Sequence, residues 1–357
     1  DVGEKEISDL TGIAGFTALT SLSCDNNQLT ALDVSNNTAL TSLYCFVNPL
    51  TALDVSANTA LTTLFCYNNQ LTALDVSNNT ALITLSCYTN QLTALDVSAN
   101  TALTILYCYG NALTSLDVSA NTALSNLRCH SNQLTSLDVS ANTALVYLYC
   151  YYNQLTSLDV SNNTALTSLK CYNNQLTALD VSANTALTKI HSDHNQLTSM
   201  NVSNNTALTE LSLMGNELTT LDVSAHTALT YFRCNGNQLT YLNMRNGVTE
   251  ALTTFNAANN PDLTCIETLD PDYATANWTN ANGNIDEGVT FSNICSSNPN
   301  VTYVPDDNFE QALIDLGYDD AMDDYVLTAN ISGVTSLDVG EKEISDLTGI
   351  AGFTALT

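Results

Sequence analysis

The sequence repeats itself every 21 residues, and this period restricts the possible folds more than any other feature. Residues 50–70 read LTALDVSANTALTTLFCYNNQ, and the same phrase returns from about Leu19 to Leu239. One such unit buries only about six apolar side chains, at roughly 1.5–3 kcal/mol each, which is too little to fold alone. The repeat therefore predicts a solenoid in which stacked coils stabilise one another. An Asn recurs in every unit, at Asn27, Asn48, Asn69, Asn90, Asn111, Asn132, Asn153, Asn174, Asn195, Asn216 and Asn237.

Alternating apolar residues within each unit predict which side chains face the core. In Leu43-Tyr44-Cys45-Phe46 the first and third residues point inward and the other two outward, as on a strand. In Leu53-Asp54-Val55 the carboxylate is the outward residue. Each coil is thus expected to contain two extended segments, and the Asn amides are expected to bond the backbone of neighbouring coils.

The first half of a unit reads L-x-x-L-x-C-x-x-N-x-L and the second half L-x-x-L-D-V-S-x-N. Over roughly residues 10–263 this resembles the nested 21-residue class of bacterial, Bacteroidota-type extracellular leucine-rich-repeat proteins. The resemblance implies an all-β-rich solenoid with short parallel strands on both sides of each coil and no convex helix. It also implies one module of a large tandem-repeat surface adhesin. We expect residues 1–263 to form about 12 turns.

The eleven cysteines divide into nine within the repeat and two outside it. Stacked side chains run parallel, so the nine inward cysteines are expected to be buried free thiols, with a metal ladder as the alternative. Residues 264–299 resemble the C-terminal cap of the same proteins and contain the only Trp. That resemblance implies a disulfide between Cys265 and Cys295, which suits an extracellular protein.

The last 20 residues, 338–357, are identical to residues 1–20. The preceding segment has Phe309, Leu313 and Leu316 at helical spacing after a start signal at Pro305. Residues 300–357 resemble a small helical N-terminal cap and first turn, here interpreted as the start of a following identical module. The alternative is a chance arrangement in a two-domain protein. Because the chain lacks an initiator Met and a signal peptide, we interpret it as part of a longer secreted or surface-displayed protein.

The chain has 7 Lys+Arg against 36 Asp+Glu, a net charge of −29. So few cations exclude nucleic-acid binding, and a membrane surface would repel the chain; direct membrane insertion is also not expected. Carboxylate oxygens suit calcium, so an acidic cluster near the C-terminus is the candidate calcium site and no other cofactor is expected. That cluster is Asp315, Asp319, Asp320, Asp323 and Asp324. A second acidic row is the outward column Asp33, Asp54, Asp75, Asp96, Asp117, Asp138, Asp159 and Asp180.

The other outward positions vary and collect aromatic and basic residues, which marks a candidate binding face. An aromatic ladder that only stiffens the solenoid is the alternative. His191, Asp193 and His194 form the one metal-like group, with too few ligands for a zinc site. The predicted ligand or partner face comprises Tyr44, Phe46, Phe65, Tyr67, Tyr88, Tyr107, Tyr109, Arg128, His130, Tyr149, Tyr151, Lys170, Tyr172, His191 and Arg233.

The sequence contains no recognisable catalytic motif, so no catalytic residues are assigned and the protein is not expected to be an enzyme. The leading hypothesis is an extracellular structural and adhesive module. Its partners would be other modules of the same protein, assembled into fibres, or a glycan or surface protein. The second hypothesis is a discrete domain that recognises one polysaccharide or protein on the same face. The third is a passive spacer.

Overall fold

A computed structural model describes residues 1–295, 298, 300–322 and 324–357. The chain forms a parallel β-solenoid of about 13 turns of 21 residues, which confirms the predicted fold class. Its residues group into two compact units. The first comprises residues 1–218, 225–237 and 251–256, and the second comprises residues 219–224, 238–250 and 257–357.

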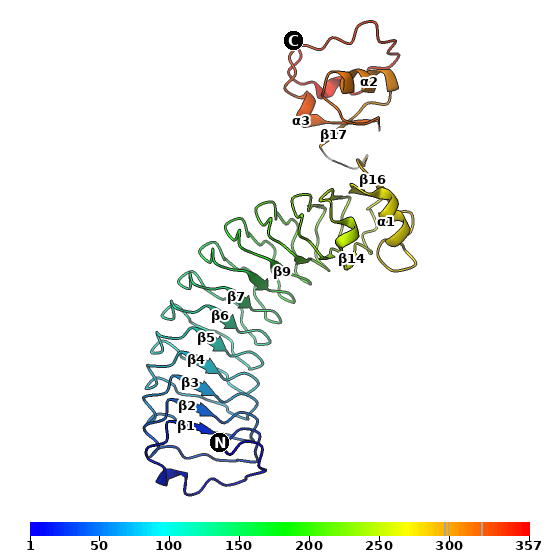
Figure 1. The fold of residues 1–357 in the computed structure, drawn as a ribbon. Coiled ribbons are helices and arrows are strands. Elements are labelled where there is room, and N and C mark those ends of the chain that lie inside the picture. The colour runs from blue at the N-terminus through cyan, green and yellow to red at the C-terminus, as the bar shows by residue number, and fades with distance from the viewer. Residues whose placement is uncertain (296–297, 299, 323) are drawn as a thin grey trace. The chain divides into compact units, whose positions relative to one another are not determined.

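The first unit contains a 12-stranded parallel sheet, with one short strand from each coil (Figure 1). Consecutive strands pair in register at an offset of one repeat, as in Leu43 opposite Leu64. A short 3-10 helix, η1, covers Ile13–Gly15 at the start of the chain. The strands are β1 (Ser21–Ser23), β2 (Ser42–Tyr44), β3 (Thr63–Phe65), β4 (Thr84–Ser86), β5 (Ile105–Tyr107), β6 (Asn126–Arg128), β7 (Tyr147–Tyr149), β8 (Ser168–Lys170), β9 (Lys189–His191), β10 (Glu210–Ser212), β12 (Tyr231–Arg233) and β14 (Thr254–Asn256).

The predicted inward residues form the core of this solenoid. Leu43, Cys45 and Val55 are fully buried, and Leu53 is buried as well. All nine cysteines of the repeat are buried and free, as expected. A thiolate in this core would lose its hydration, so burial raises the pKa of each of these thiols.

The Asn column beside the strands connects neighbouring coils, as predicted. Asn48 is representative: its Oδ1 accepts the backbone N–H of Leu29 at 3.0 Å. Its Nδ2 donates to the carbonyls of Cys24 at 3.1 Å and Cys45 at 3.2 Å. One amide side chain thus satisfies backbone groups of two coils, which explains why no other residue occurs in this column.

The opposite side of the coil requires one correction. Instead of a strand in every coil, the first unit has one isolated bridge on this side among its described residues, Asp33 with Asp54. Side chains satisfy the backbone there. Asn58 Nδ2 donates to the carbonyl of Val34 at 3.0 Å, and the carboxylate of Asp33 accepts the N–H of Ser35 at 3.0 Å. These groups are therefore not available for a continuous ladder.

The second unit contains a four-stranded parallel sheet in the order β11 (Thr220–Asp222), β13 (Tyr241–Met244), β15 (Cys265–Thr268) and β16 (Thr290–Ser292). It also includes a helix, α1 (Pro271–Asn277), which contacts β15 and β16, while a 3-10 turn, η2, covers Thr249–Ala251.

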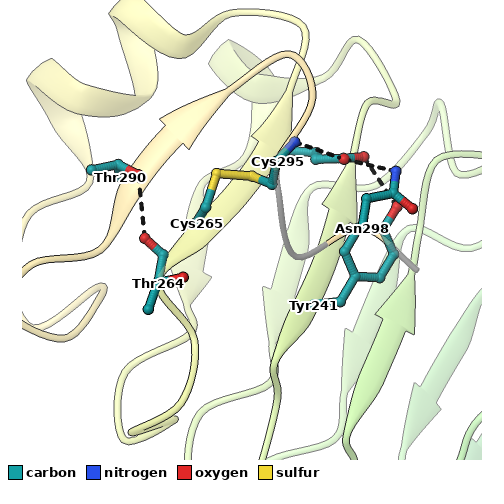
Figure 2. The surroundings of a disulfide bond; sticks show 7 residues. Tyr241, Thr264, Cys265, Thr290, Cys295 and Asn298 are labelled. Carbon is teal, nitrogen blue, oxygen red and sulfur yellow. Dashed lines mark hydrogen bonds between the residues drawn. A yellow bond between two sulfur atoms is a disulfide. The ribbon is translucent and has the colours of Figure 1, made fainter. Parts of the chain in front are cut away.

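A disulfide joins Cys265 and Cys295, the pair that the cap resemblance implies (Figure 2). Beside it lies the fully buried Glu267. The Glu267 carboxylate accepts from the Cys295 N–H at 3.0 Å, from Asn298 Nδ2 at 2.8 Å and from the Tyr241 hydroxyl at 3.0 Å. These donors compensate for burying a carboxylate, so this residue has a structural role in the cap.

The C-terminal part of the second unit is a small element with its own core. It contains an antiparallel pair, β17 (Val301–Tyr303) with β18 (Tyr325–Leu327), and the helices α2 (Asp307–Asp315) and α3 (Thr328–Ile331). The predicted helix forms as α2, with Asp306 as its N-cap. Leu316 is not a core residue: the helix ends before it and the side chain is 44% exposed. None of the described helices is long and apolar enough to cross a bilayer.

Candidate partner-binding face

The predicted face residues fall into two columns along the 12-stranded sheet. The strand-end column occupies the last strand position and pairs in register, for example Tyr107 with Arg128 and Arg128 with Tyr149. Its predicted members are Tyr44, Phe65, Tyr107, Arg128, Tyr149, Lys170, His191 and Arg233. The ring column lies two residues further along each coil and comprises Phe46, Tyr67, Tyr88, Tyr109, His130, Tyr151 and Tyr172. The structure therefore brings all the predicted face residues onto one side of the coils, in the strands of one sheet or two residues beyond the strand ends.

Consecutive rings of the ring column stack on each other. Centroids lie 4.4 Å apart for Phe46 and Tyr67, 4.0 Å for His130 and Tyr151, and 4.2 Å for the other four pairs. Planes differ by no more than 17°. The cause is the register: neighbouring strands place equivalent residues about 4.8 Å apart, close to ring-stacking distance. Ring faces thus contact other rings, and every ring is half-buried with an edge left outward.

An aspartate occupies the same coil position beyond each end of this stack, Asp25 before Phe46 and Asp193 after Tyr172. Asp193 Oδ1 accepts the Ser212 hydroxyl at 2.5 Å and the Met214 N–H at 2.8 Å. The stack therefore has a defined length.

Cations of the strand-end column lie over tyrosine rings. The Arg128 guanidinium is 4.6 Å from the Tyr107 centroid and 5.1 Å from that of Tyr149. Lys170 Nζ lies 5.2 Å from the ring centroid of Tyr149. Such contacts contribute about 0.5–1 kcal/mol each at exposed sites. The charges of Arg128 and Lys170 are thus held over tyrosine rings, while Arg233 donates to the Tyr231 hydroxyl at 3.4 Å.

Towards the later coils the face includes an ion-pair group. Glu210 accepts from Lys189 at 2.6 Å, and its second oxygen lies 3.3 Å from His191 Nε2. Burial, and then the nearby Lys170, lower the pKa of His191 despite this carboxylate. Lys189 and Glu210 therefore neutralise each other's charge in this part of the face.

The stack itself is uncharged at neutral pH. Burial, with Arg128 as a smaller cause, lowers the pKa of His130 to about 4. Its imidazole is consequently neutral and stacks like the other rings. Burial raises the pKa values of the ring-column tyrosines, so their hydroxyls keep their protons.

The predicted metal sites do not assemble among the described residues, where no group of three or more His, Cys, Asp or Glu could hold an ion. Asp315 instead pairs with Lys342 at 2.9 Å and accepts from Gln311 at 3.0 Å. Asp323, one member of the predicted calcium cluster, lies outside the described residues.

Two exposed tyrosines of this region are absent from the predicted set, as is the half-buried Tyr231 beside His191. Tyr147 is 41% exposed and Tyr152 is 54% exposed. Strand parity could have identified Tyr147, because it lies two residues before Tyr149. Tyr152 has no such signal: it sits in a left-handed turn at φ 51°, where its ring packs edge-on against Tyr151 and Tyr172.

No family model matches the chain, and no curated protein matches it. Among solved structures it is similar to InlJ of Listeria monocytogenes, whose functional domain includes a cysteine ladder. That match has 37% identity, a TM-score of 0.68, and covers 75% of this chain and 68% of the chain of that functional domain. It is also similar to an internalin, inlF, of the same species, with 24% identity, a TM-score of 0.67 and 82% and 85% coverage. A leucine-rich-repeat protein of Leptospira interrogans matches with 26% identity, a TM-score of 0.61 and 72% and 68% coverage.

Proposed function

The chain belongs to the family of bacterial leucine-rich-repeat proteins that includes InlJ, and from this premise we propose a non-enzymatic extracellular structural and adhesive module. It forms part of a tandem array and uses the ring and strand-end columns for self-association or attachment to a protein. The ring column is the observation that carries this proposal. Solenoid surfaces of this kind commonly serve as extended binding surfaces.

The stacking geometry favours a protein partner over a glycan. Sugars bind to aromatic faces, but the faces of the ring column lie against each other at 4.0–4.4 Å. What the column offers to a partner is a regular row of ring edges and hydroxyls. Tyr is enriched at protein interfaces because it combines a large apolar body with a hydrogen-bonding end.

Self-association is supported by charge. At a net charge of −29, most faces of two copies repel each other. The ring column is uncharged, and the cations beside it are held over rings, as Arg128 is over Tyr107. This is the surface on which two copies approach with the least repulsion. An extracellular setting is supported by the Cys265–Cys295 disulfide, since such bonds persist in oxidising compartments.

The test replaces Tyr107, Tyr109, Tyr149 and Tyr151 together with Ser. Beads coated with the wild-type protein are expected to aggregate with each other, and beads coated with the variant are not. The matched control changes four residues on the opposite side of the same coils, Asp96, Asp117, Asp138 and Asp159, to Asn. Circular dichroism and protection of the buried thiols check that both variants fold. Equal aggregation of the tyrosine variant and the wild type would contradict the proposal.

The second candidate function is discrete recognition of one ligand on the same face. Its support is the irregular strand-end column, where Arg128, Lys170 and His191 replace aromatic residues. A uniform adhesive surface does not need such variation. Screening the protein against a glycan array and a panel of extracellular proteins distinguishes the two: one reproducible hit that depends on Arg128 favours recognition.

A further inference from the structure

The ring column contains three pairs of tyrosines whose rings lie parallel on consecutive coils. The pairs are Tyr67–Tyr88, Tyr88–Tyr109 and Tyr151–Tyr172. In each pair the centroids are 4.2 Å apart and the planes differ by no more than 10°. The two members occupy the same coil position, so one ring is nearly a translated copy of the other. Equivalent carbons of the two rings are therefore about as far apart as the centroids.

This arrangement suits one reaction of phenols, which is oxidative coupling. When a phenol loses one electron and one proton, the unpaired electron is shared by the oxygen, the ortho carbons and the para carbon. In tyrosine the para carbon carries the side chain, so two such radicals join through their ortho carbons. Radicals on stacked rings meet without diffusion, and proximity of this kind accelerates a reaction by orders of magnitude.

The other members of the stack limit coupling to these three pairs. Phe46 stacks on Tyr67 at one end, and His130 lies between Tyr109 and Tyr151. Neither Phe nor His has a phenolic hydroxyl, so neither ring forms the radical. The ring column is thus divided into one run of three tyrosines and one run of two.

The other described tyrosine pairs in ring contact are not parallel. The planes of Tyr147 and Tyr149 differ by 77° at a centroid distance of 6.5 Å. Those of Tyr303 and Tyr325 differ by 40° at 5.2 Å. Tyr152 meets its two neighbours in the ring column edge-on. Only the ring column therefore holds the ortho carbons of two phenols against each other among the described residues.

An oxidant has access to the rings, whereas the thiols that would repair a tyrosyl radical do not. The ring-column tyrosines are half-buried with an edge outward, and the more exposed Tyr152 lies 5.5 Å from Tyr172. Cys87 and Cys108 directly precede ring-column tyrosines but are fully buried in the core. Burial raises the pKa of both thiols, so neither is a reactive thiolate at neutral pH.

We propose that these three pairs are modification sites at which a haem peroxidase, using hydrogen peroxide, forms dityrosine links between consecutive coils. Each phenol gives one electron to the peroxidase and one proton to water. A carbon–carbon bond then forms between the ortho carbons, and each ring transfers its ortho hydrogen to its own oxygen to restore the phenol. The two electrons and two protons reduce one hydrogen peroxide to two water molecules.

Such a link would reinforce the solenoid. It joins residues 21 positions apart in the sequence, and closing a loop of this length restricts the unfolded chain more than the folded one. The Cys265–Cys295 disulfide indicates an oxidising compartment, in which covalent reinforcement of this kind persists.

This inference goes beyond the proposed adhesion, because it concerns a covalent link within one chain. The adhesion variant with Tyr107, Tyr109, Tyr149 and Tyr151 changed to Ser keeps the Tyr67–Tyr88 pair. It should therefore still form that link, although beads coated with it no longer aggregate. Each proposal can thus fail without the other.

The test oxidises the folded chain with a haem peroxidase and hydrogen peroxide, at several dilutions at which the chain is monomeric. Dityrosine fluorescence measures the yield. Proteolysis and mass spectrometry identify the linked peptides, which weigh two hydrogen atoms less than the separate peptides. We expect links at the three stacked pairs, a yield per chain that does not depend on dilution, and a yield at least about tenfold lower from the chain unfolded in urea.

Phenylalanine variants keep the stack but remove the reactive hydroxyls. Tyr88→Phe removes two of the three pairs, so only the Tyr151–Tyr172 link should remain. Adding Tyr151→Phe removes the last pair, and the double variant should form no link within the ring column. Tyr147→Phe changes an exposed tyrosine outside this column and is the matched control, with the wild-type yield expected.

Three results would overturn the proposal. One is a wild-type yield from the double variant of Tyr88 and Tyr151. The second is a set of links that follows exposure, with Tyr147 and Tyr152 as the main sites. The third is a yield per chain that rises with protein concentration, because the links would then form between molecules.

Discussion

The two halves of one coil have similar sequences but satisfy their backbones in different ways. In the half that contains Leu43 and Cys45, a strand ladder pairs the backbone groups. In the half that contains Leu53 and Val55, side chains bond many of the backbone groups. Asn58 donates to the Val34 carbonyl, and Asp54 accepts the Ser56 N–H. The comparison explains why one half varies and the other does not.

Where the ladder bonds the backbone, outward side chains are not needed to satisfy backbone groups and can change from coil to coil. Tyr107, Arg128 and Lys170 occupy equivalent positions for this reason. Where side chains bond the backbone, the sequence stays almost entirely Asp and Asn, and the exception His226 keeps the same contact, with its Nε2 3.1 Å from the Val202 carbonyl. The uniform Asp column therefore consists of turn residues that bond the backbone. The strand-end column can vary in sequence and so can evolve a binding function.

The largest expected effect concerns the core, where the Cys of one half of the coil corresponds to the Val of the other half. The pKa of each buried thiol is raised in the folded state, so stability is fully present below the unfolded pKa near 9 and is lost as pH rises above it. Each thiol weakens folding by about 1.4 kcal/mol per pH unit there. Urea unfolding at pH 7, 9 and 10 should show a steep loss of stability.

Replacing Cys66, Cys108 and Cys150 with Val, the residue of the opposite half, is the control for this alkaline loss. It should reduce the slope by about 4 kcal/mol per pH unit. An unchanged slope would mean that other groups cause the alkaline unfolding.

The next effect concerns the side-chain-bonded half. Asn142→Ala removes the donor from the buried carbonyls of Val118 and Asn121, each now bonded at 2.9 Å. Each carbonyl keeps one backbone donor, the N–H of Asn121 or of Leu124, so the variant loses two hydrogen bonds and leaves a cavity at a fully buried site, which together cost about 2–4 kcal/mol. Denaturant unfolding measures the loss. Ala141→Asn is the matched control and should be neutral, because the next coil already has Asn162 there; a loss as large as that of Asn142→Ala would contradict this account.

A smaller effect is expected on the ladder-bonded half. Tyr109→Ala removes stacking on Tyr88 and His130, both 4.2 Å away, at about 0.5–1.5 kcal/mol per ring pair. We expect a loss of about 1–3 kcal/mol by the same measurement. Tyr109→Phe keeps the ring and should retain most of the stability. A loss for Tyr109→Phe as large as for Tyr109→Ala would show that the hydroxyl, and not stacking, matters.

The smallest effect is predicted for the acidic row. Changing its eight aspartates to Asn, from Asp33 to Asp180, should leave the melting temperature nearly unchanged, because Asn201 already accepts the Ser203 N–H at 3.0 Å in the same way. The net charge falls from −29 to −21, since eight negative charges are removed. A large drop in melting temperature would show that the charge itself, for example through bound calcium, stabilises the fold.

Much of the fold was predictable because the same pattern of inward and outward residues recurs in every 21-residue coil. Strand parity alone placed Leu43 and Cys45 inside and Tyr44 and Phe46 outside. Register then aligned the predicted face residues in two columns, one at the strand ends and one two residues beyond them. The extent of the second-side strands was not predictable. Asn and Asp at those positions are compatible with a ladder or with side-chain bonds, and only the packed backbone decides between them.

The sequence by itself determined the solenoid, its core and the two ends that share residues 1–20, because periodicity and identity can be read directly from residue order. The tertiary structure decided which surfaces are free. Stacking turned an apparent field of exposed rings into a row of half-buried rings whose faces contact one another. The physical reason is that exposure depends on neighbours distant in the chain: Tyr67, for example, is covered by Tyr88, 21 residues further along.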